Sequence, residues 1–528
     1  MKLIYGVKDK PKFGQVIIFA IQQLLAIMAA TLVVPVIIGH GMSPVAALFG
    51  AGIGTLVYLL FTKFRSPVFL GSSFAFLGSM AAAFAGGVSV GLGYIGLILG
   101  AVFAGLVYVV IALIVKFAGV KWLNKLMPAV VIGPTVALIG LSLAGNAVGD
   151  MNKTNVITTL DPDQYKVVEI KKDAGFDQDG NLVVGGVEYV VVDADAVADE
   201  NGTIPADKIH NEISLAKDEN GVPTKDENGN YGYSANLGSN YVALICAFVT
   251  LAVTILCSVY GKKFLKLIPF IIGIAAGYAA ASIFYIIGVA TSNPALMIID
   301  YSPFLALVEN GVNISTFFTV PEFTFLTAFG SFSELNGTYV ASIAVAYVPV
   351  AFVVFAEHIA DHKNISSIIE KDLLEDPGLH RTLLGDGVGS MAGALFGGCP
   401  NTTYGESVAC VAITGNASVV TIITTAIGAI AISFLAPFVT IVNSIPSCVM
   451  GGVCMALYGF IAVSGLKMIK KVDLEHNANL FTVSAILIAG IGGLTLSFGQ
   501  VTITSIACAL ILGIIVNIIV NKARKSEE

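Results

Sequence analysis

A single carboxylate stands out in the second half of the sequence. Residues 387–466 contain one formally charged side chain, Glu406, between apolar runs long enough to cross a bilayer. A carboxylate at the centre of a bilayer costs at least about 2.5–3.5 kcal/mol, so such a residue usually serves a function and has a partner. Pro400 and Gly405 interrupt the helical pattern beside it. We therefore interpret Glu406 as part of a binding site; the alternative is a carboxylate at the membrane surface or in a structural hydrogen bond.

A second group of titratable residues ends an earlier apolar run. Glu357 and Asp361 are four residues apart and share one helical face, whereas His358 and His362 share a neighbouring face. Hydropathy alone places Glu357 near the end of the run, where a solvated charge would be ordinary. However, residues 365–369 continue the helical pattern and would bury Glu357 more deeply.

The two glutamates suit different tasks if they face each other. Glu406 begins a half-helix, whose N-terminal dipole favours the ionised carboxylate. Glu357 lies within a continuous helix in apolar surroundings with a second carboxylate nearby, and both features favour its protonated form. We therefore expect Glu357 to take up and release a proton and Glu406 to act as a fixed acceptor.

Two five-residue segments echo each other. Residues 71–75 (Gly-Ser-Ser-Phe-Ala) and 401–405 (Asn-Thr-Thr-Tyr-Gly) share one order of residue types, and each lies in the third apolar run of its half. Each follows a proline and interrupts a helix, which leaves backbone N–H groups that hydrocarbon cannot satisfy. Broken helices in an inverted repeat point to a binding site at the membrane midplane, here near Phe74 and Tyr404. The alternative is a chance match in a chain rich in small polar residues.

These residues need a membrane scaffold to hold them. Apolar residues make up 56% of the chain and charged residues 12%, a composition that excludes an ordinary soluble protein. Successive apolar stretches near 20 residues predict an all-α polytopic membrane protein with two broken spans. We expect fourteen spans, at 14–38, 43–62, 67–86, 90–115, 123–148, 239–260, 264–288, 338–362, 383–398, 401–415, 417–441, 446–466, 477–497 and 500–521.

The placement of charge sets the orientation of the spans. Outside residues 150–238 the chain has 21 Lys and Arg, and all of them fall at the N-terminus or after even-numbered spans. By the positive-inside rule both termini are cytoplasmic, and the protein is a multi-pass protein of the cell membrane. The first 13 residues are basic and lead straight into the first span, so no cleavable signal peptide is expected.

Residues 150–238 form a separate, acidic segment. They carry 18 of the 35 acidic residues and seven lysines, a local net charge of −11, and the topology places them outside the cell. Residues 182–192 have two β-rich runs around Gly-Gly, which predicts a hairpin, and residues 217–221 recur at 225–229. Residues 177–181 hint at a calcium loop, but no Glu follows at the required distance, which favours a solvated turn. We expect a small β-rich external domain.

The chain thus divides into six parts, and nothing in it indicates an enzyme. The seven cysteines all fall in apolar segments without metal-ligand spacing, so we expect no metal site. No nucleophile–base group or cofactor loop has supporting context, so we expect neither enzymatic activity nor a cofactor. The parts are 1–149 (first repeat, spans 1–5), 150–238 (external insert), 239–290 (spans 6–7), 291–337 (external connecting loop), 338–521 (second repeat, spans 8–14) and 522–528 (cytoplasmic tail).

At these motifs the chain resembles the nucleobase–ascorbate transporter family, and most of all its bacterial uracil permeases. The resemblance spans nearly the whole membrane body and is most specific at residues 71–76, 356–358, 371–381 and 400–406. It implies a seven-plus-seven inverted repeat divided into core and gate domains. It also implies uptake of a nucleobase, with the proton as the coupling ion, and a homodimer.

The resemblance implies roles for individual residues as well. Glu357 and Glu406 would accept hydrogen bonds from the base, while the backbone N–H groups of Phe74 and Gly405 would donate to its carbonyls. Tyr404 and Phe74 would flank the ring, or simply pack. Glu rather than Gln at position 406 favours uracil over xanthine-type bases.

The chain departs from the family pattern in three places. Ser407 and Ala409 replace the Asn and Gly that usually follow the acidic residue, and residues 22–23 (Gln-Gln) stand for the family's Gln-His pair. Asp361 stands where uracil permeases can carry a histidine implicated in proton coupling.

The third departure leaves the proton route open. The proton-coupling candidates are therefore Glu357, Asp361 and the adjacent His362. Asp386, at the start of span 9, is a weaker candidate, and we interpret it instead as a charge at the cytoplasmic end of that span.

Three other functions remain open at this stage. A permease for xanthine or another nucleobase would keep the same site. An anion transporter would suit paired half-helix N-termini, although Glu406 would repel an anion. A receptor-like sensor would use the acidic segment 150–238 to bind a ligand or partner.

Overall fold

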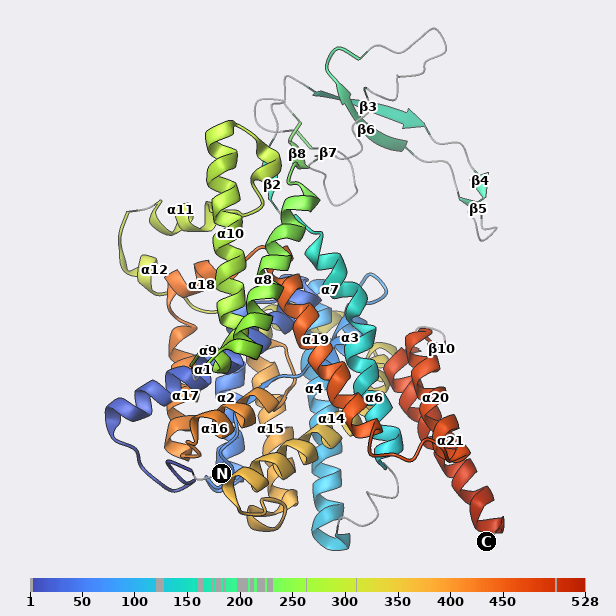
Figure 1. Cartoon of the computed structure of the whole chain (residues 1–528). Coiled ribbons are helices and arrows are strands. Elements are labelled where there is room, and N and C mark those ends of the chain that lie inside the picture. Colours follow the sequence, from blue (N-terminus) through green and yellow to red (C-terminus); the bar gives the residue numbers. More distant parts are fainter. Residues whose placement is uncertain are drawn as a thin grey trace.

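The protein is mostly helical in a computed structural model (Figure 1). The structure describes residues 3–119, 128–154, 156–159, 165–171, 175–176, 182–183, 187–196, 208, 213–215, 224–225, 231–262, 264–309, 311–498 and 501–527.

Eight helices in these described ranges are long and apolar enough to cross a membrane. They are α1 (Phe13–Ile38), α2 (Pro44–Phe61), α4 (Val90–Ala118), the joined pair α6 (Ala129–Ser142) and α7 (Ala144–Met151), α8 (Asn240–Tyr260), α10 (Pro269–Thr291), α14 (Gly337–Ile369) and α19 (Ser447–Ile469). The other helices include α3 (Leu77–Ala83), α9 (Phe264–Leu267), α15 (Leu379–Gly397), α16 (Gly405–Thr414), α17 (Val419–Ile432), α18 (Ala436–Asn443), α20 (Asn477–Ile491) and α21 (Ser505–Glu527). The connection between α10 and α14 holds α11 (Ser302–Val308), α12 (Ile314–Phe317) and α13 (Thr324–Ala328).

Most of the expected spans coincide with one of these helices, in some cases preceded by a short strand, whereas 264–288, 417–441 and the described part of 123–148 each correspond to two successive helices. The borders differ at a few places, because α15 begins at Leu379 rather than 383 and α21 at Ser505 rather than 500. The polytopic α-helical fold class is thus as expected, whereas the count of fourteen crossings stays a prediction.

Local sequence sets where several of these helices begin. The side chains of Ser43, Ser89 and Asn336 each accept a hydrogen bond from a backbone N–H three residues ahead, at 3.2, 3.1 and 2.9 Å. These residues are preferred N-caps because their side chains satisfy a donor that the helix itself leaves unpaired. Helices α2, α4 and α14 therefore start at the first residue after a polar cap.

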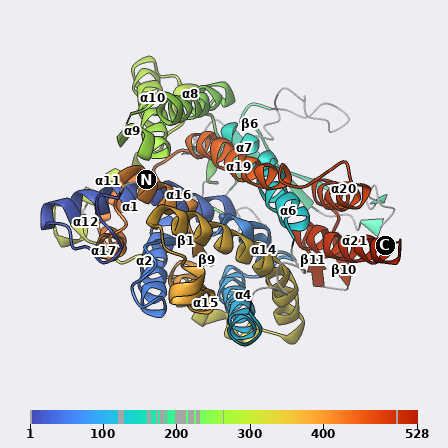
Figure 2. The same ribbon diagram turned by 60° about the horizontal axis from the view of Figure 1, so that its bottom comes forward.

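The helices pack in two groups (Figure 2). In the first group, α2 contacts α15 and α17, α4 contacts α14 and α15, and α1 contacts α2 and α17. In the second group, α6 contacts α19, α20 and α21, and α8 contacts α10 and α19. The two groups face each other across α14 and α16 on one side and α10 and α19 on the other.

Glycines hold the first group together where α2 crosses α15. A Cβ atom added to Gly50 would lie 2.3 Å from the carbonyl oxygen of Gly393, and one added to Gly54 would lie 2.7 Å from that of Gly389. Only helices without side chains at the contact approach this closely, a packing common in membrane proteins. This close approach brings the chain that follows α2 next to the chain that follows α15.

The two echoing segments meet at that place as an antiparallel pair of strands. Strand β1 (Leu70–Ser72) pairs with β9 (Asn401–Thr403), with Gly71 opposite Thr402. Two further backbone bonds extend the pairing, from Tyr404 N–H to Phe69 O at 3.2 Å and from Ser73 N–H to Pro400 O at 2.9 Å. Backbone groups that a broken helix leaves without partners thus satisfy each other. After β1 the chain continues into a 3-10 turn (Phe74–Phe76) and α3, and after β9 into α16.

An ion-pair cluster fixes the connection between α14 and α15. The carboxylate of Asp376 contacts Lys371 at 2.6 Å and also pairs with Arg65, which follows α2. The pKa of Asp376 lies below its usual range, chiefly because of the hydrogen bond from Lys371 and secondly because of the one from Arg65. These three charged residues, which the expected topology places on the cytoplasmic side of the membrane, therefore lie together.

The acidic insert contains short strands, as expected, but its hairpin is different. Strand β6 (Val187–Asp193) pairs with β3 (Tyr165–Lys171), and β5 (Leu182–Val183) pairs with β4 (Gly175–Phe176). Both ladders keep one register, with Lys171 opposite Val187 and Gly175 opposite Val183. The hairpin predicted around the Gly-Gly of 182–192 is therefore wrong, because the runs on either side of it pair with earlier strands. The two glycines of this segment and the segment 177–181 lie outside the described residues. The repeat at 217–229 lies outside them as well, except for residues 224–225.

A second small sheet sits nearer the membrane helices. It has the order β2 (Ile157–Thr159), β8 (Tyr233–Asn236) and β7 (Ile213–Leu215), so its central strand leads directly into α8. A last pair of strands, β10 (Leu496–Phe498) and β11 (Val501–Ile503), connects α20 and α21.

Candidate functional site

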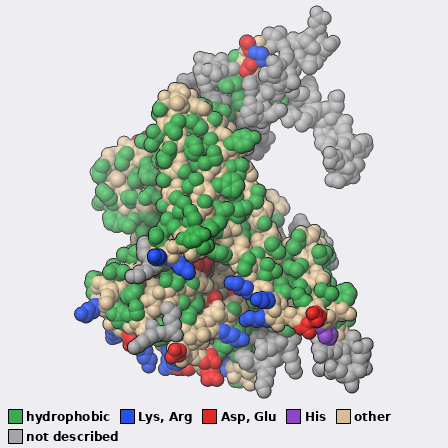
Figure 3. Space-filling model, in the orientation of Figure 1, with side chains coloured by type: hydrophobic (Ala, Val, Ile, Leu, Met, Phe, Trp, Pro, Cys, Tyr) green, Lys and Arg blue, Asp and Glu red, His purple; other side chains and the backbone are tan. Residues whose placement is uncertain are grey.

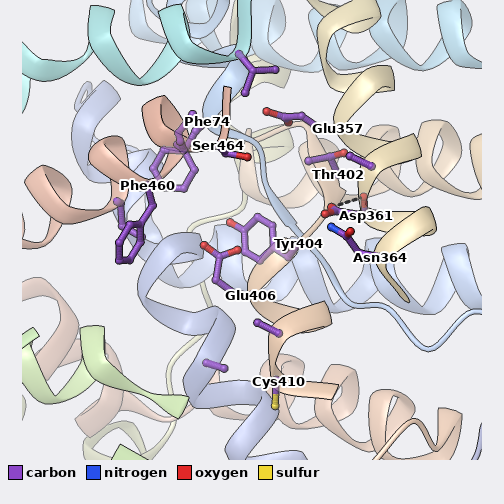
Figure 4. Close-up of a pocket in the computed structure, with 18 of the residues that line it drawn as sticks. Phe74, Glu357, Asp361, Asn364, Thr402, Tyr404, Glu406, Cys410, Phe460 and Ser464 are labelled. Carbon is purple, nitrogen blue, oxygen red and sulfur yellow. Dashed lines mark hydrogen bonds between the residues drawn. The ribbon is translucent and has the colours of Figure 1, made fainter. Parts of the chain in front are cut away.

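A cavity of about 590 Å³ lies beside the paired strands, between the two groups of helices (Figure 4). Its lining includes all five residues expected to contact substrate, which are Phe74, Glu357, Tyr404, Gly405 and Glu406. Residues from seven segments that are far apart in the sequence therefore converge on one space.

Helix α14 brings its carboxylates to one wall of the cavity. The helix runs without interruption to Ile369, as the pattern of residues 365–369 indicated, so Glu357 lies well before its end. Glu357, Asp361 and Asn364 all line the cavity, at a spacing of four and three residues that places them on one helical face. The side chains of Glu357 and Asp361 are both half-buried.

The second broken helix, α16, contacts α14 and borders the same side of the cavity. Glu406 is the second residue of α16, after the N-cap Tyr404, and its side chain is half-buried in the cavity. No side chain caps α16 or the turn that begins at Phe74. The first N–H groups of a helix have no acceptor within the helix, so donors from both breaks border the cavity. The cavity thus offers carboxylate acceptors and backbone donors together.

Tyr404 has a structural task that limits what it can do for a ligand. Its hydroxyl donates to the carbonyl oxygen of Ser72 at 2.7 Å, and its side chain is almost fully buried. Its ring lies over Gly71, where an added Cβ atom would come within 2.3 Å of the ring. Of the two aromatic residues expected near the ligand, Phe74 is the more exposed, and its ring meets Tyr458 edge-on with centroids 6.0 Å apart.

Asp361 is tied to the second break. The hydroxyl of Thr403, in β9, donates to a carboxylate oxygen of Asp361 at 3.0 Å, and both residues line the cavity (Figure 4). A carboxylate on the continuous helix is thereby linked to the strand that leads into Glu406.

His362 lies elsewhere, although it is adjacent to Asp361 in sequence. It is fully buried and does not line the cavity. Its Nε2 atom is 2.7 Å from the hydroxyl of Tyr58, and its Nδ1 atom is 2.8 Å from the carbonyl oxygen of His358. Consecutive residues of a helix point in directions about 100° apart, so Asp361 can face the cavity while His362 faces α2.

The structure also shows a buried cluster that the sequence interpretation missed. Asp386 is fully buried, and one of its oxygens lies 2.7 Å from Nδ1 of His358 and 3.3 Å from the hydroxyl of Thr402. The interpretation of Asp386 as a charge at the cytoplasmic end of a span is therefore wrong. The earlier start of α15, at Leu379, moves Asp386 two turns into the helix. In the sequence, the only indication of this cluster was the hydroxyl residue Thr402 in the segment 401–405.

The comparison with known families decides what class of protein this is. The model of the permease family, Xan_ur_permease, matches residues 14–169 and 228–498. The chain belongs to the permease family. Together with its long apolar helices, this makes the permease a multi-pass membrane transport protein rather than an enzyme. The resemblance to nucleobase–ascorbate transporters is thereby confirmed.

Curated relatives match the permease over its whole length. It is 34% identical to the uracil permease of Bacillus subtilis (strain 168), over 100% of this chain and 97% of that protein. It is 31% identical to the uracil permease of Escherichia coli (strain K12), over 96% of this chain and 92% of that protein. Among solved structures, the transmembrane domain of a cyanobacterium bicarbonate transporter, BicA, has a TM-score of 0.55 at 13% identity, and covers 97% of this chain and 99% of that one. This last likeness concerns the fold alone.

Two departures from the family pattern contact each other in the permease. The side-chain amide of Gln23, in α1, donates to the hydroxyl of Ser407 at 2.5 Å, and the backbone N–H of Phe69 donates to the same hydroxyl at 2.9 Å. Gln23 and Ser407 are both buried. The residue after Glu406 is thus held to the first helix and to the first break.

Proposed function

We propose that the permease imports a nucleobase, uracil, by proton symport. The observation that carries this proposal is the cavity itself, which is lined both by Glu357 and Glu406 and by the uncapped helix starts at Phe74 and Gly405. Full-length similarity to uracil permeases supports the same cargo.

The chemistry of uracil fits this combination of groups. Uracil alternates N–H donors and C=O acceptors around one small ring, so it needs acceptors and donors side by side. In the proposal Glu357 and Glu406 accept from the ring N–H groups, and the N–H groups of Phe74 and Gly405 donate to the carbonyls. Phe74 covers one face of the ring, and Tyr404 shapes the site by holding Gly71 and Ser72. Hydrogen bonds to charged groups are among the stronger ones in proteins, which suits a polar ligand of this size.

The coupling proton is assigned to the carboxylates of α14. Glu357 lies in the middle of a continuous helix with a second carboxylate one turn away, and such an arrangement favours binding of a proton. Asp361 is the nearer of the two remaining candidates, because it lines the cavity and His362 does not. The proton then enters with the base and leaves once the cavity opens to the other side.

The proposed transport cycle is alternating access between the two groups of helices. It assumes fourteen crossings in a seven-plus-seven inverted repeat, which the meeting of the two echoing segments as β1 and β9 supports. It also assumes cytoplasmic termini, residues 150–238 outside and insertion in the cell membrane, as the charge pattern supports. The resemblance to the family is the basis for proposing a homodimer.

Two alternatives differ in cargo. Another nucleobase, such as xanthine, would use the same groups, and Glu at position 406 favours uracil over it. Anion transport is suggested by the likeness to the bicarbonate transporter fold and by uncapped helix starts. Against it, three carboxylates line the cavity, and a carboxylate repels an anion.

A binding panel tests the proposed cargo. Purified permease is titrated with uracil, thymine, xanthine, hypoxanthine and bicarbonate, and its thermal stability is followed. Uracil raises the melting temperature at the lowest concentration, since a ligand that binds only the folded state stabilises it. Stabilisation by bicarbonate with no response to any base would overturn the assignment.

A further inference from the structure

The cavity has a second, oppositely charged part that a single base does not use. Lys266, from α9, and Lys467, from the end of α19, line the same cavity as Glu357 and Glu406. Both lysine side chains are exposed, and within the described part of the chain neither forms an ion pair. Figure 3 shows basic side chains around a hollow on the side of the molecule away from the insert, with acidic side chains inside it.

The length of the cavity separates the two parts. Along α19 the lining residues Leu457, Phe460, Ser464 and Lys467 follow one face of the helix. Ten residues of helix span about 15 Å, at about 1.5 Å per residue. In the expected topology α14 and α19 cross the membrane in the same direction, so the lining residues from Glu357 to Asn364 run the same way. The cavity therefore runs from a floor with carboxylates to a mouth with lysines, and its volume of about 590 Å³ is that of a site for a ligand larger than one pyrimidine ring.

Lysines alone would carry little weight, because the ends of membrane helices on this side are commonly basic. These two differ from Lys470 and Lys471, which follow on the same helix end but do not line the cavity. A ligand that fits the whole space needs an uncharged donor–acceptor ring at one end and an anion at the other. Carboxylates at the floor exclude the opposite orientation by repulsion.

We propose that the permease binds a nucleoside monophosphate from the lysine-bearing side, with its base on the carboxylate floor and its phosphate on Lys266 and Lys467. Ammonium groups bind phosphate through charge-assisted hydrogen bonds. The ribose at N1 of a uracil nucleotide removes one N–H donor, and the second N–H and both carbonyls stay free for the floor. This inference rests on the proposed function, because it places the base in the proposed uracil site.

Such a nucleotide inhibits transport rather than being carried. It contacts α14 and α16 in one group of helices and α9 and α19 in the other, so it holds the two groups in the arrangement that is open to the lysine side. The nucleotide made from an imported base thereby lowers further import.

The experiment measures binding of uracil, uridine and uridine monophosphate to the purified full chain. Uridine carries the same ribose without the phosphate. The ratio of the affinity for uridine monophosphate to the affinity for uridine therefore isolates the phosphate contact. The parent binds the monophosphate about 10-fold or more tightly than uridine, a typical gain for hydrogen bonds to charged groups. In the double variant Lys266→Gln, Lys467→Gln this ratio falls to about one. The matched control Lys471→Gln, on an exposed residue outside the cavity, keeps the parent ratio.

Three results would overturn the inference. The first is a parent ratio near one while uracil still binds, and the second is a ratio that the double variant leaves unchanged. The third is displacement of uracil by inorganic phosphate as well as by the monophosphate, since the base would then add nothing. Absence of uracil binding would instead contradict the proposed function. In membrane vesicles, the monophosphate is expected to inhibit uracil transport only from the lysine-bearing side.

Discussion

Nδ1 of His358 lies 2.7 Å from a carboxylate oxygen of Asp386, and neither side chain is exposed to solvent. Nε2 of His358 is also 2.9 Å from the hydroxyl of Thr382, so both ring nitrogens have partners. Because Thr402 contacts the same Asp386 oxygen, this pair connects α14 and α15 to strand β9. His358 directly follows Glu357, so the pair fixes the helix that carries the proposed proton site.

Removing His358 is expected to destabilise the permease strongly. Removing one partner of a buried hydrogen bond typically costs about 1–3 kcal/mol, and more where a charged group is left buried without a partner. We expect His358→Ala to lower the melting temperature of the purified protein clearly, and Asp386→Asn to do so less because its amide still reaches the imidazole. The control His380→Gln alters a partly exposed histidine on α15 and should have little effect. Equal melting temperatures for His358→Ala and the control would contradict this account.

Glu406 is expected to decide whether the base binds at all. Glu406→Ala removes the acceptor and abolishes measurable uracil binding. Glu406→Gln keeps the size of the side chain but loses the charge, and should weaken binding about 10-fold or more, since charge-assisted hydrogen bonds are worth about 1.5–3 kcal/mol. Calorimetric titration measures both, with the exposed Glu309→Gln as a control. Parent-like affinity in Glu406→Ala would remove this residue from the site.

Glu357 is expected to matter more for coupling than for binding. In proteoliposomes, Glu357→Gln should lose accumulation of uracil driven by a pH gradient, because a glutamine cannot hold the coupling proton. Counterflow exchange needs no net proton movement and should persist at a reduced rate. Loss of both activities in equal measure would assign Glu357 to binding alone.

The contact between β1 and Tyr404 can be tested with a single methyl group. A Cβ atom at Gly71 would lie 2.3 Å from the ring of Tyr404, so Gly71→Ala must displace the residue that precedes Gly405 and Glu406. Overpacking of this kind costs about 1–3 kcal/mol, and here it should also weaken uracil binding. Gly78→Ala, on α3, is the matched control, because its nearest neighbour would be 4.0 Å away. Equal uracil affinity for the two variants would show that the position of Tyr404 does not govern the site.

Much of the site was predictable because it violates the rules of its surroundings. A lone carboxylate in an apolar stretch and two interrupted helices are costly in a membrane, so Glu406 and the segments at 71–75 and 401–405 are visible in one sequence. The continuation of α14 past Glu357 was likewise readable from the helical pattern of residues 365–369.

The parts that escaped prediction depend on partners far away in the chain. Ser407 accepts a hydrogen bond from Gln23, which lies 384 positions earlier. Nothing in the sequence around either residue indicates that the two are in contact. Asp386 looked like a terminal charge because hydropathy could not place the first turns of α15. In the insert, Val187–Asp193 could pair with any apolar run. It pairs with Tyr165–Lys171 instead of forming the predicted hairpin within 182–192, because this pairing forms a longer ladder.

Uptake of labelled uracil into proteoliposomes under an imposed pH gradient tests the central claim most directly. The account predicts that initial uptake rises as the external pH falls, that uracil accumulates above its external concentration, and that a protonophore abolishes the accumulation. It also predicts that Glu406→Ala abolishes uptake at every pH. Uracil uptake that is indifferent to the gradient would contradict proton symport, and bicarbonate uptake without uracil uptake would contradict the proposed cargo.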